Sequence, residues 1–174
     1  MLRTAEASPF SARPEKTMVE AITLSDLVCT ETEVLVQAWK KWRGWNAMPS
    51  YRAWRDARLG RFTEHASVAR ILSDGDDYEF EFIGDAHMRA YGVNHSGGRV
   101  SEIEQLSPRF GKQLRASYDF VRISGRPQAF QGYIGKEVAA SGFVWFETVY
   151  LPLSVDGIVG YILNAAMYRL RADA

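Results

Sequence analysis

Apolar residues follow a helical spacing near the start of the chain, and this spacing predicts an N-terminal amphipathic helix. Between residues 30 and 43, Leu35, Trp39 and Trp42 recur at intervals of four and three, which places them on one helical face. The segment opens with Thr-Glu-Thr-Glu, a capping-box pattern with Thr30 as the N-cap residue. The sequence therefore predicts a helix whose tryptophan face must pack against another surface.

Farther along the chain, alternating apolar and polar positions predict strands instead. The strand candidates are residues 67–72, 78–83, 128–134, 143–153 and 158–167. An Asp-Gly pair lies between the first two candidates and between the last two, so both connections are predicted to be hairpins. Helices are expected over residues 85–91 and 108–124. This order predicts an α+β fold with a mainly antiparallel five-stranded sheet and the helices gathered on one face.

The pattern divides the chain into three regions. Residues 1–28 show no sustained periodicity and are expected to form a flexible tail, with a short helical piece beginning at Met18. Residues 29–62 contain the predicted helix and a lead-in rich in basic and aromatic side chains. Residues 63–170 hold the predicted sheet and are expected to form the core of a single domain.

Composition narrows the class of protein. The 174 residues include 21 basic and 21 acidic side chains, 47% of residues are apolar, and Cys29 is the only cysteine. Zero net charge argues against a dedicated nucleic-acid binder, and the apolar content excludes a disordered chain. A lone cysteine forms no intrachain disulfide, and no apolar run is long enough to span a membrane. A cytoplasmic protein is therefore expected.

Four short motifs occur in order between residues 34 and 168. They are Trp42-Arg43-Gly44 with Met48-Pro49-Ser50, Phe82-Ile83-Gly84-Asp85-Ala86 with Tyr91-Gly92, Tyr118 with Gly125-Arg126-Pro127, and Trp145-Phe146-Glu147 with Asp156-Gly157. In this order they resemble a PAS sensory domain, in particular the short stand-alone PAS proteins of alphaproteobacteria. The resemblance implies a PAS-like five-stranded sheet with an N-terminal cap helix. It also implies a regulatory role whose output passes through a protein partner, because the chain contains no output domain.

The resemblance further implies a ligand pocket between the sheet and the helices. The resemblance places Phe146, Thr148 and Tyr150 on the sheet side of this pocket. Strand pairing then puts Tyr161 beside them, although one bulge would exchange the residues of the last strand for the set that contains Asn164. The expected ligand-binding residues are Tyr118, Phe146, Thr148, Tyr150 and Tyr161. Such aromatic side chains can surround a small planar or acyl ligand, or they can fill the core completely.

No cofactor or metal is predicted. PAS relatives that use flavin attach it to a cysteine within the core, whereas Cys29 precedes the core. Haem-binding relatives place an axial histidine on or near the long helix, and residues 107–125 contain none. His65, His87 and His95 match no metal-ligand spacing. We expect His87 to be a surface or half-buried helix residue and His95 to be solvated.

The lead-in is strongly basic. Residues 40–61 carry seven basic side chains and one acidic side chain, interleaved with aromatic residues. The tryptophans are expected to pack on the sheet, while the charged groups face water and suit an acidic protein partner rather than nucleic acid. The cap helix is expected to dock on the sheet or to pair with a second copy in a homodimer. Its predicted partner surface is Leu35, Trp39 and Trp42.

The alternative class is a small cone-shaped α+β enzyme of the isomerase or dehydratase type. Its acid–base pair would be Asp85 with His87, or Glu147 with Tyr150. Residues two apart on a helix do not share a face, and residues three apart on a strand point to opposite faces. Neither pair is therefore expected to converge. The sequence favours a non-catalytic regulatory module that binds a small ligand, a protein partner or both.

Overall fold

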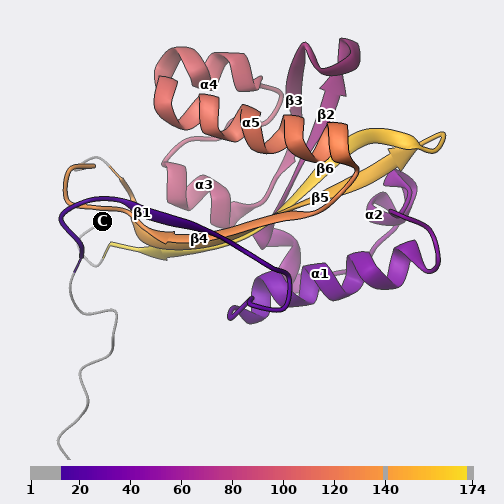
Figure 1. The fold of residues 1–174 in the computed structure, drawn as a ribbon, viewed down its shortest axis with the longest axis horizontal. Helices are drawn as coiled ribbons and strands as arrows, with labels where there is room; N and C mark the ends of the chain where they lie inside the picture. Colours follow the sequence, from indigo (N-terminus) through magenta and orange to yellow (C-terminus); the bar gives the residue numbers. More distant parts are fainter. Residues whose placement is uncertain (1–12, 139–140, 172–174) are drawn as a thin grey trace, which may run out of the picture.

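A six-stranded antiparallel sheet forms the centre of the protein in the computed structural model, which describes residues 13–138 and 141–171 (Figure 1). The strands lie in the order β1-β4-β5-β6-β2-β3. Their bounds are β1 Met18–Ile22, β2 Ala66–Leu72, β3 Asp77–Ile83, β4 Gln128–Tyr133, β5 Phe143–Val155 and β6 Ile158–Leu170. The α-helices are α1 Thr30–Arg43, α2 Tyr51–Arg55, α3 Asp85–Tyr91, α4 Val100–Leu106 and α5 Pro108–Ser124. None of the helices in these described ranges is long and apolar enough to cross a bilayer.

The five predicted strands correspond to β2 through β6, which confirms the α+β class and the antiparallel sheet. β5 and β6 form the predicted hairpin, and Asp156 and Gly157 at its turn have positive φ angles of 50° and 87°. Two successive positive φ angles are typical of the two-residue turn that an Asp-Gly pair favours. Next to the turn, the register shifts by one residue between Leu153 and Ser154, and Tyr150 lies opposite Asn164.

The sixth strand, β1, corrects the prediction that Met18 begins a helical piece within a flexible tail. β1 pairs with β4 along its whole length at the edge of the sheet. Gly132 permits this pairing, because a Cβ atom at that position would lie 2.4 Å from the backbone oxygen of Met18. Ahead of β1, the Arg13 guanidinium donates hydrogen bonds to three carbonyl oxygens of the loop 134–138. The first part of the predicted tail, residues 1–12, lies outside the described residues.

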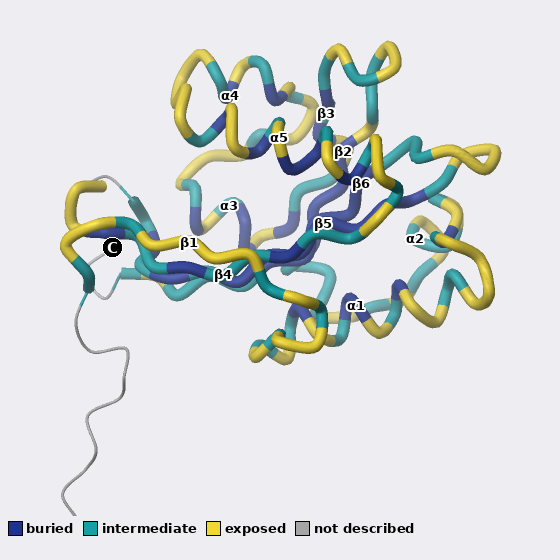
Figure 2. Tube along the Cα trace, in the orientation of Figure 1, coloured by how far each residue is buried: buried dark blue, intermediate teal, exposed yellow. Residues whose placement is uncertain are grey.

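Helices cover both faces of the sheet, which corrects the prediction of helices on one face only (Figure 1). α1 and α2 pack against one face, and α3, α4 and α5 lie on the other. The reason is visible in β5, where every residue from Glu147 to Leu153 is buried (Figure 2). Neighbouring residues of a strand point to opposite faces, so a strand buried at consecutive positions needs cover on both sides.

α1 starts at Thr30, but the predicted capping box does not form. The N-cap residue is Cys29, and its side chain makes no capping hydrogen bond. Instead, the fully buried carboxylate of Glu147 reaches the helix from β5. It accepts hydrogen bonds from the backbone N–H of Val28 (2.8 Å) and Cys29 (3.1 Å) and from the Thr32 hydroxyl. A carboxylate at the positive end of the helix dipole therefore fixes α1 to the sheet.

Candidate functional site

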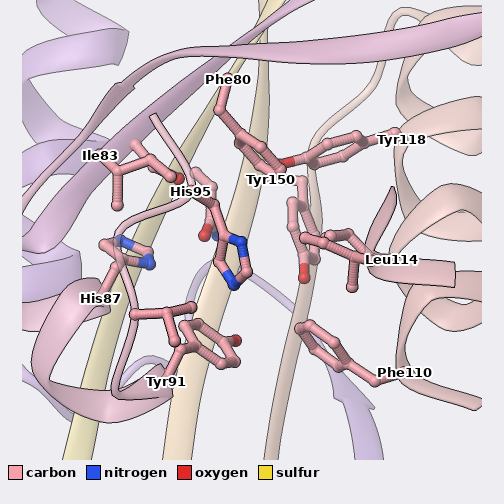
Figure 3. A pocket seen from close by; sticks show the side chains of 13 residues that line it. Phe80, Ile83, His87, Tyr91, His95, Phe110, Leu114, Tyr118 and Tyr150 are labelled. Carbon is pink, nitrogen blue, oxygen red and sulfur yellow. The ribbon is translucent and has the colours of Figure 1, made fainter. Parts of the chain in front are cut away.

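A cavity lies between the sheet and the helices α3, α4 and α5 (Figure 3). It has two compartments, of about 110 Å³ and about 40 Å³, which share Tyr91, Phe110, Leu114 and Tyr150 as lining residues. The larger compartment extends toward β1 and β4, and the smaller one toward β2, β3 and the loop after α3. Within the described parts of the chain, neither lining contains an Asp, Glu, Lys or Arg side chain.

Alternation along β5 and β6 supplies the sheet side of this cavity. Phe146, Thr148 and Tyr150 point from β5 into the larger compartment, on the side where the resemblance places them. In the β5–β6 ladder, Tyr168 lies opposite Phe146 and Asn164 lies opposite Tyr150. Tyr168 and Asn164 therefore share the cavity face, and each lines one of the compartments.

Tyr161 lies on the opposite face of the sheet, which corrects the predicted lining. Its ring stacks on that of Tyr51 from α2, with centroids 3.8 Å apart and an interplanar angle of 11°. The cause is the register shift between Leu153 and Ser154. This irregularity is the bulge case that counting along the strands leaves open, and it turns the set containing Asn164 toward the cavity.

Tyr118 of α5 and Tyr150 of β5 meet edge to face at the cavity wall (Figure 3). Their ring centroids are 5.6 Å apart at an interplanar angle of 81°. Burial raises the pKa of both phenols above the ordinary value, so both are neutral near pH 7. Tyr118 is only 1% exposed, and among the described residues none makes a hydrogen bond with its hydroxyl.

Asn164 and Thr148 form a second polar pair at this wall. Asn164 Nδ2 donates to Thr148 Oγ1 (2.6 Å) and to the carbonyl oxygen of Val149 (3.1 Å). A carbonyl oxygen can only accept, so this contact fixes the orientation of the Asn164 amide. The Oδ1 atom of Asn164 is left without a hydrogen-bond partner among the residues that the structure describes.

A buried chain of polar groups runs from His87 to the cavity. His87 Nε2 lies 3.2 Å from the carbonyl oxygen of His65, so Nε2 carries the ring proton, and Nδ1 accepts from the Tyr168 hydroxyl at 3.1 Å. The Tyr168 hydroxyl in turn accepts from that of Tyr91 at 3.3 Å. Burial lowers the pKa of His87 from 6.5 to about 4, so the ring is neutral near pH 7.

The sequence expectation of a surface or half-buried His87 is therefore wrong, because the side chain is almost completely buried. The spacing of residues along α3 could have predicted this burial. His87 and Tyr91 are four residues apart on a short helix whose buried residues also include Ala86 and Ala90, so the two polar residues share the face that packs on the sheet. Tyr91 is a lining residue that the sequence prediction missed.

His95 reaches the cavity from the loop between α3 and α4, although we expected it to be solvated (Figure 3). Two backbone hydrogen bonds hold this loop against β3. Gly97 N donates to the Phe80 carbonyl at 2.7 Å, and Phe80 N donates to the Gly98 carbonyl at 2.9 Å. The half-buried imidazole of His95 thereby forms part of the outer wall of the smaller compartment.

β1 and the residue before it close one side of the larger compartment, which Thr17 and Val19 line. Thr17 is fixed to the loop after β4, since its hydroxyl accepts from Gly135 N at 3.0 Å and its backbone N–H donates to the Glu137 carboxylate. A segment that the sequence assigns to a flexible tail therefore supplies part of the cavity wall.

The predicted partner surface on α1 is covered by the chain's own sheet. Leu35 and Trp39 are buried, and the Trp39 indole N–H donates to the carbonyl oxygen of Pro152 at 2.8 Å. Trp42 is half-buried and packs edge to face against Trp54 at 6.4 Å. The cap helix thus docks on the sheet, and this intramolecular packing removes Leu35 and Trp39 from any exposed partner surface.

The basic lead-in presents an exposed surface around α2 and the end of α1. Trp42 and Trp54 pack on the core as predicted, whereas Trp45 is 105% exposed. The exposed basic side chains are Lys40, Lys41, Arg52, Arg55, Arg58 and Arg61. Asp56 forms ion pairs with Arg52 at 3.3 Å and with Arg55 at 3.6 Å. One carboxylate cannot balance this many basic groups, so the surface keeps an excess of positive charge.

Neither candidate acid–base pair converges. Asp85 is exposed while His87 is buried, and Glu147 lies on the α1 side of the sheet while Tyr150 lies on the cavity side. Residues 13–138 and 141–171 include no cluster of three or more His, Cys, Asp or Glu residues that could hold a metal ion. Cys29 lies beside Glu147 on the α1 side, and burial raises its pKa to about 12, which keeps it a thiol.

No protein-family model, curated protein or solved structure matches the chain significantly. The functional argument therefore rests on the cavity itself. Its walls are aromatic and uncharged, and they carry hydroxyl, amide and imidazole groups in fixed positions. Such a lining is typical of a site that binds a small organic molecule.

Proposed function

We propose that the protein is a PAS-like sensory module that binds a small molecule in the cavity and signals to a protein partner. The observation that carries the proposal is the aromatic cavity with the hydroxyl of Tyr118 at its wall, which makes no hydrogen bond with another described residue. Among the described residues, the fully buried side-chain atoms that lack a partner are Arg43 Nε and Gln128 Oε1, so the Tyr118 hydroxyl keeps accessible surface toward the cavity. A ligand in the cavity would form a hydrogen bond with this hydroxyl in place of water.

The order of the elements supports the PAS-like part of the proposal. Strands β2 to β6 form a continuous antiparallel sheet of five strands, and α3, α4 and α5 all lie between β3 and β4 in the chain. The motifs that carry the resemblance fall at element junctions. Gly84 precedes α3, Gly125 ends α5, and Asp156 and Gly157 form the β5–β6 turn.

The lining favours a sensor over the isomerase or dehydratase alternative. Such an enzyme needs an acid and a base that reach the same substrate. No carboxylate from the described residues lines the cavity, and His87 uses both ring nitrogens within the protein. Among the described lining residues this leaves the imidazole of His95 without a carboxylate, lysine or second free imidazole to complete an acid–base pair. The phenols of Tyr118 and Tyr150 have raised pKa values, which makes them poor proton donors near pH 7.

The signal would pass to an acidic protein partner at the exposed basic surface around Trp45. Opposite charges steer such encounters and set partner choice. This assignment replaces Leu35 and Trp39, which are buried in the protein's own core. The proposed site of action is the cytoplasm, where a partner and a small-molecule signal would both be available.

Native mass spectrometry of freshly purified protein, together with an absorbance spectrum, tests the proposed function. We expect the wild-type protein to carry a small molecule that is released on denaturation, and the same spectra report its oligomeric state. Phe146→Trp should abolish this occupancy, because the larger side chain fills the larger compartment. Phe120→Trp, at an exposed position of α5, is the matched control and should retain the molecule. Wild-type protein that remains empty even after dialysis against a small-molecule cell extract would contradict the proposal.

A further inference from the structure

We infer that the ligand is an uncharged molecule with a single aromatic ring and a substituent, such as a hydroxyl group, that both donates and accepts hydrogen bonds. This inference rests on the proposed function, since it names the class of ligand for the same cavity. It follows from three independent properties of the cavity. These are its size and shape, the lack of charged side chains in the described lining, and the hydrogen-bond donors and acceptors that the lining leaves available.

The dimensions of the cavity select a single ring. The two adjoining compartments have volumes of about 110 Å³ and about 40 Å³, and together they match the apolar cavity of about 150 Å³ that binds benzene. Aromatic side chains surround the larger compartment on several sides, and Phe143 and Phe146 meet at 83° with centroids 6.1 Å apart. Mutually inclined rings offer edge-to-face and offset contacts to a flat guest. The smaller compartment, about 40 Å³, admits a substituent only.

The absence of charge in the lining selects a neutral ligand. Across residues 13–138 and 141–171, no acidic, lysine or arginine side chain lines either compartment. The imidazole of His87 is neutral and fully hydrogen-bonded within the protein. His95 is the other imidazole in the described lining, and it carries no permanent charge. A ligand carboxylate or ammonium group would therefore find no permanently charged partner, and burying an unpaired charge costs far more than burying a neutral polar group.

The polar groups of the wall define what the substituent must do. The Tyr118 hydroxyl has no partner among the described residues and can donate to the ligand. The Asn164 amide nitrogen is occupied by Thr148 and Val149, so its free Oδ1 atom can only accept. The Tyr91 hydroxyl donates to Tyr168, so its oxygen can also accept. A ligand hydroxyl group both accepts and donates, so it suits the donor and the acceptor groups of this wall.

Three molecules of nearly equal size and different charge test this inference. They are benzyl alcohol, benzoate and benzylammonium, each titrated into the full-length protein at pH 7.5 by isothermal titration calorimetry. We expect benzyl alcohol to bind saturably. Benzoate and benzylammonium should bind at least about tenfold more weakly, because their charges are buried without a partner.

Tyr118→Phe tests the hydrogen bond separately from the shape. This substitution should weaken the binding of benzyl alcohol about five- to tenfold, which corresponds to the loss of one hydrogen bond. It should leave the binding of toluene unchanged, because toluene has no hydroxyl group. Tyr51→Phe is the matched control, since the Tyr51 hydroxyl bonds to Glu81 on the other side of the sheet. It should leave the binding of every probe unchanged. Thermal unfolding of both variants checks that the fold is retained.

The outcomes separate this inference from the proposed function. Benzoate or benzylammonium binding as tightly as benzyl alcohol would overturn the inferred ligand class, and so would a Tyr118→Phe variant that binds benzyl alcohol like the wild type. If no probe binds while the purified protein releases a molecule of another class, the inference fails and the proposed function stands. If no probe binds and the cavity is also empty in the purified protein, both fail.

Discussion

Replacement of Glu147 by glutamine should loosen α1 from the sheet and destabilise the whole protein. The Glu147 side chain is 0% exposed, and its two carboxylate oxygens serve three donors, the backbone N–H groups of Val28 and Cys29 and the Thr32 hydroxyl. Glutamine has nearly the same volume but offers one accepting oxygen, and its NH₂ group would face backbone donors. At least one buried donor therefore loses its acceptor.

The magnitude follows from these contacts. A hydrogen bond to a charged group contributes about 1.5–3 kcal/mol, and leaving a buried donor unsatisfied costs about 1–3 kcal/mol. Loss of the negative charge at the N-terminus of α1 acts in the same direction. We therefore expect Glu147→Gln to lower the free energy of unfolding by about 2–4 kcal/mol, a large part of the total stability of a domain of this size.

Urea unfolding followed by circular dichroism measures this change, with the wild type and two further variants. Glu20→Gln is the matched control, because Glu20 is exposed on β1 and should shift stability by less than about 0.5 kcal/mol. Thr32→Val removes one donor, and a double-mutant cycle with Glu147→Gln should show a coupling energy of about 1 kcal/mol. A Glu147→Gln variant within about 0.5 kcal/mol of the wild type would refute the assignment of this carboxylate as the attachment of α1.

Three further predictions test other parts of the structure. Burial lowers the pKa of His87 from 6.5 to about 4, so the unfolded chain binds a proton more readily and stability falls as the pH drops from 6.5 toward 4. The difference in unfolding free energy between the wild type and His87→Gln should therefore shrink by about 2 kcal/mol between pH 7.5 and pH 5. A difference that does not change with pH would contradict this prediction. Gly132→Ala should displace β1, because the new Cβ atom would lie 2.4 Å from the backbone oxygen of Met18. Hydrogen exchange should then show that the amides of residues 18–22 lose protection while those of β2 to β6 keep it. Full protection of β1 in the variant would contradict this prediction. In urea unfolding, Trp39→Ala should lower the free energy of unfolding by about 3–5 kcal/mol and Trp45→Ala by less than about 0.5 kcal/mol, since only Trp39 is buried. Equal effects of the two substitutions would contradict the packing of α1 on the sheet.

Local patterns predicted the elements well where each element carries its own signal. The helix over residues 30–43 and the Asp156-Gly157 hairpin were both predictable, because helical spacing and turn chemistry are properties of neighbouring residues. Strand alternation groups Phe146, Thr148 and Tyr150 on one face of β5, and the resemblance assigns that face to the pocket, which these residues line. Tyr161 was misplaced because one register shift at Leu153 and Ser154 reverses the faces of β6, and periodicity alone does not reveal a bulge.

The sequence by itself determined the fold class, the positions of the main elements and the aromatic character of the space between sheet and helices. Only the tertiary structure decided that residues 18–22 form a strand, that Glu147 caps α1, and that Tyr118 is left without a hydrogen-bond partner among the described residues. The physical reason is the range of the interactions. Met18 pairs with Tyr133, and Glu147 accepts from Val28, which lies 119 residues away in the chain. Such contacts depend on how the elements pack, and no local pattern records them.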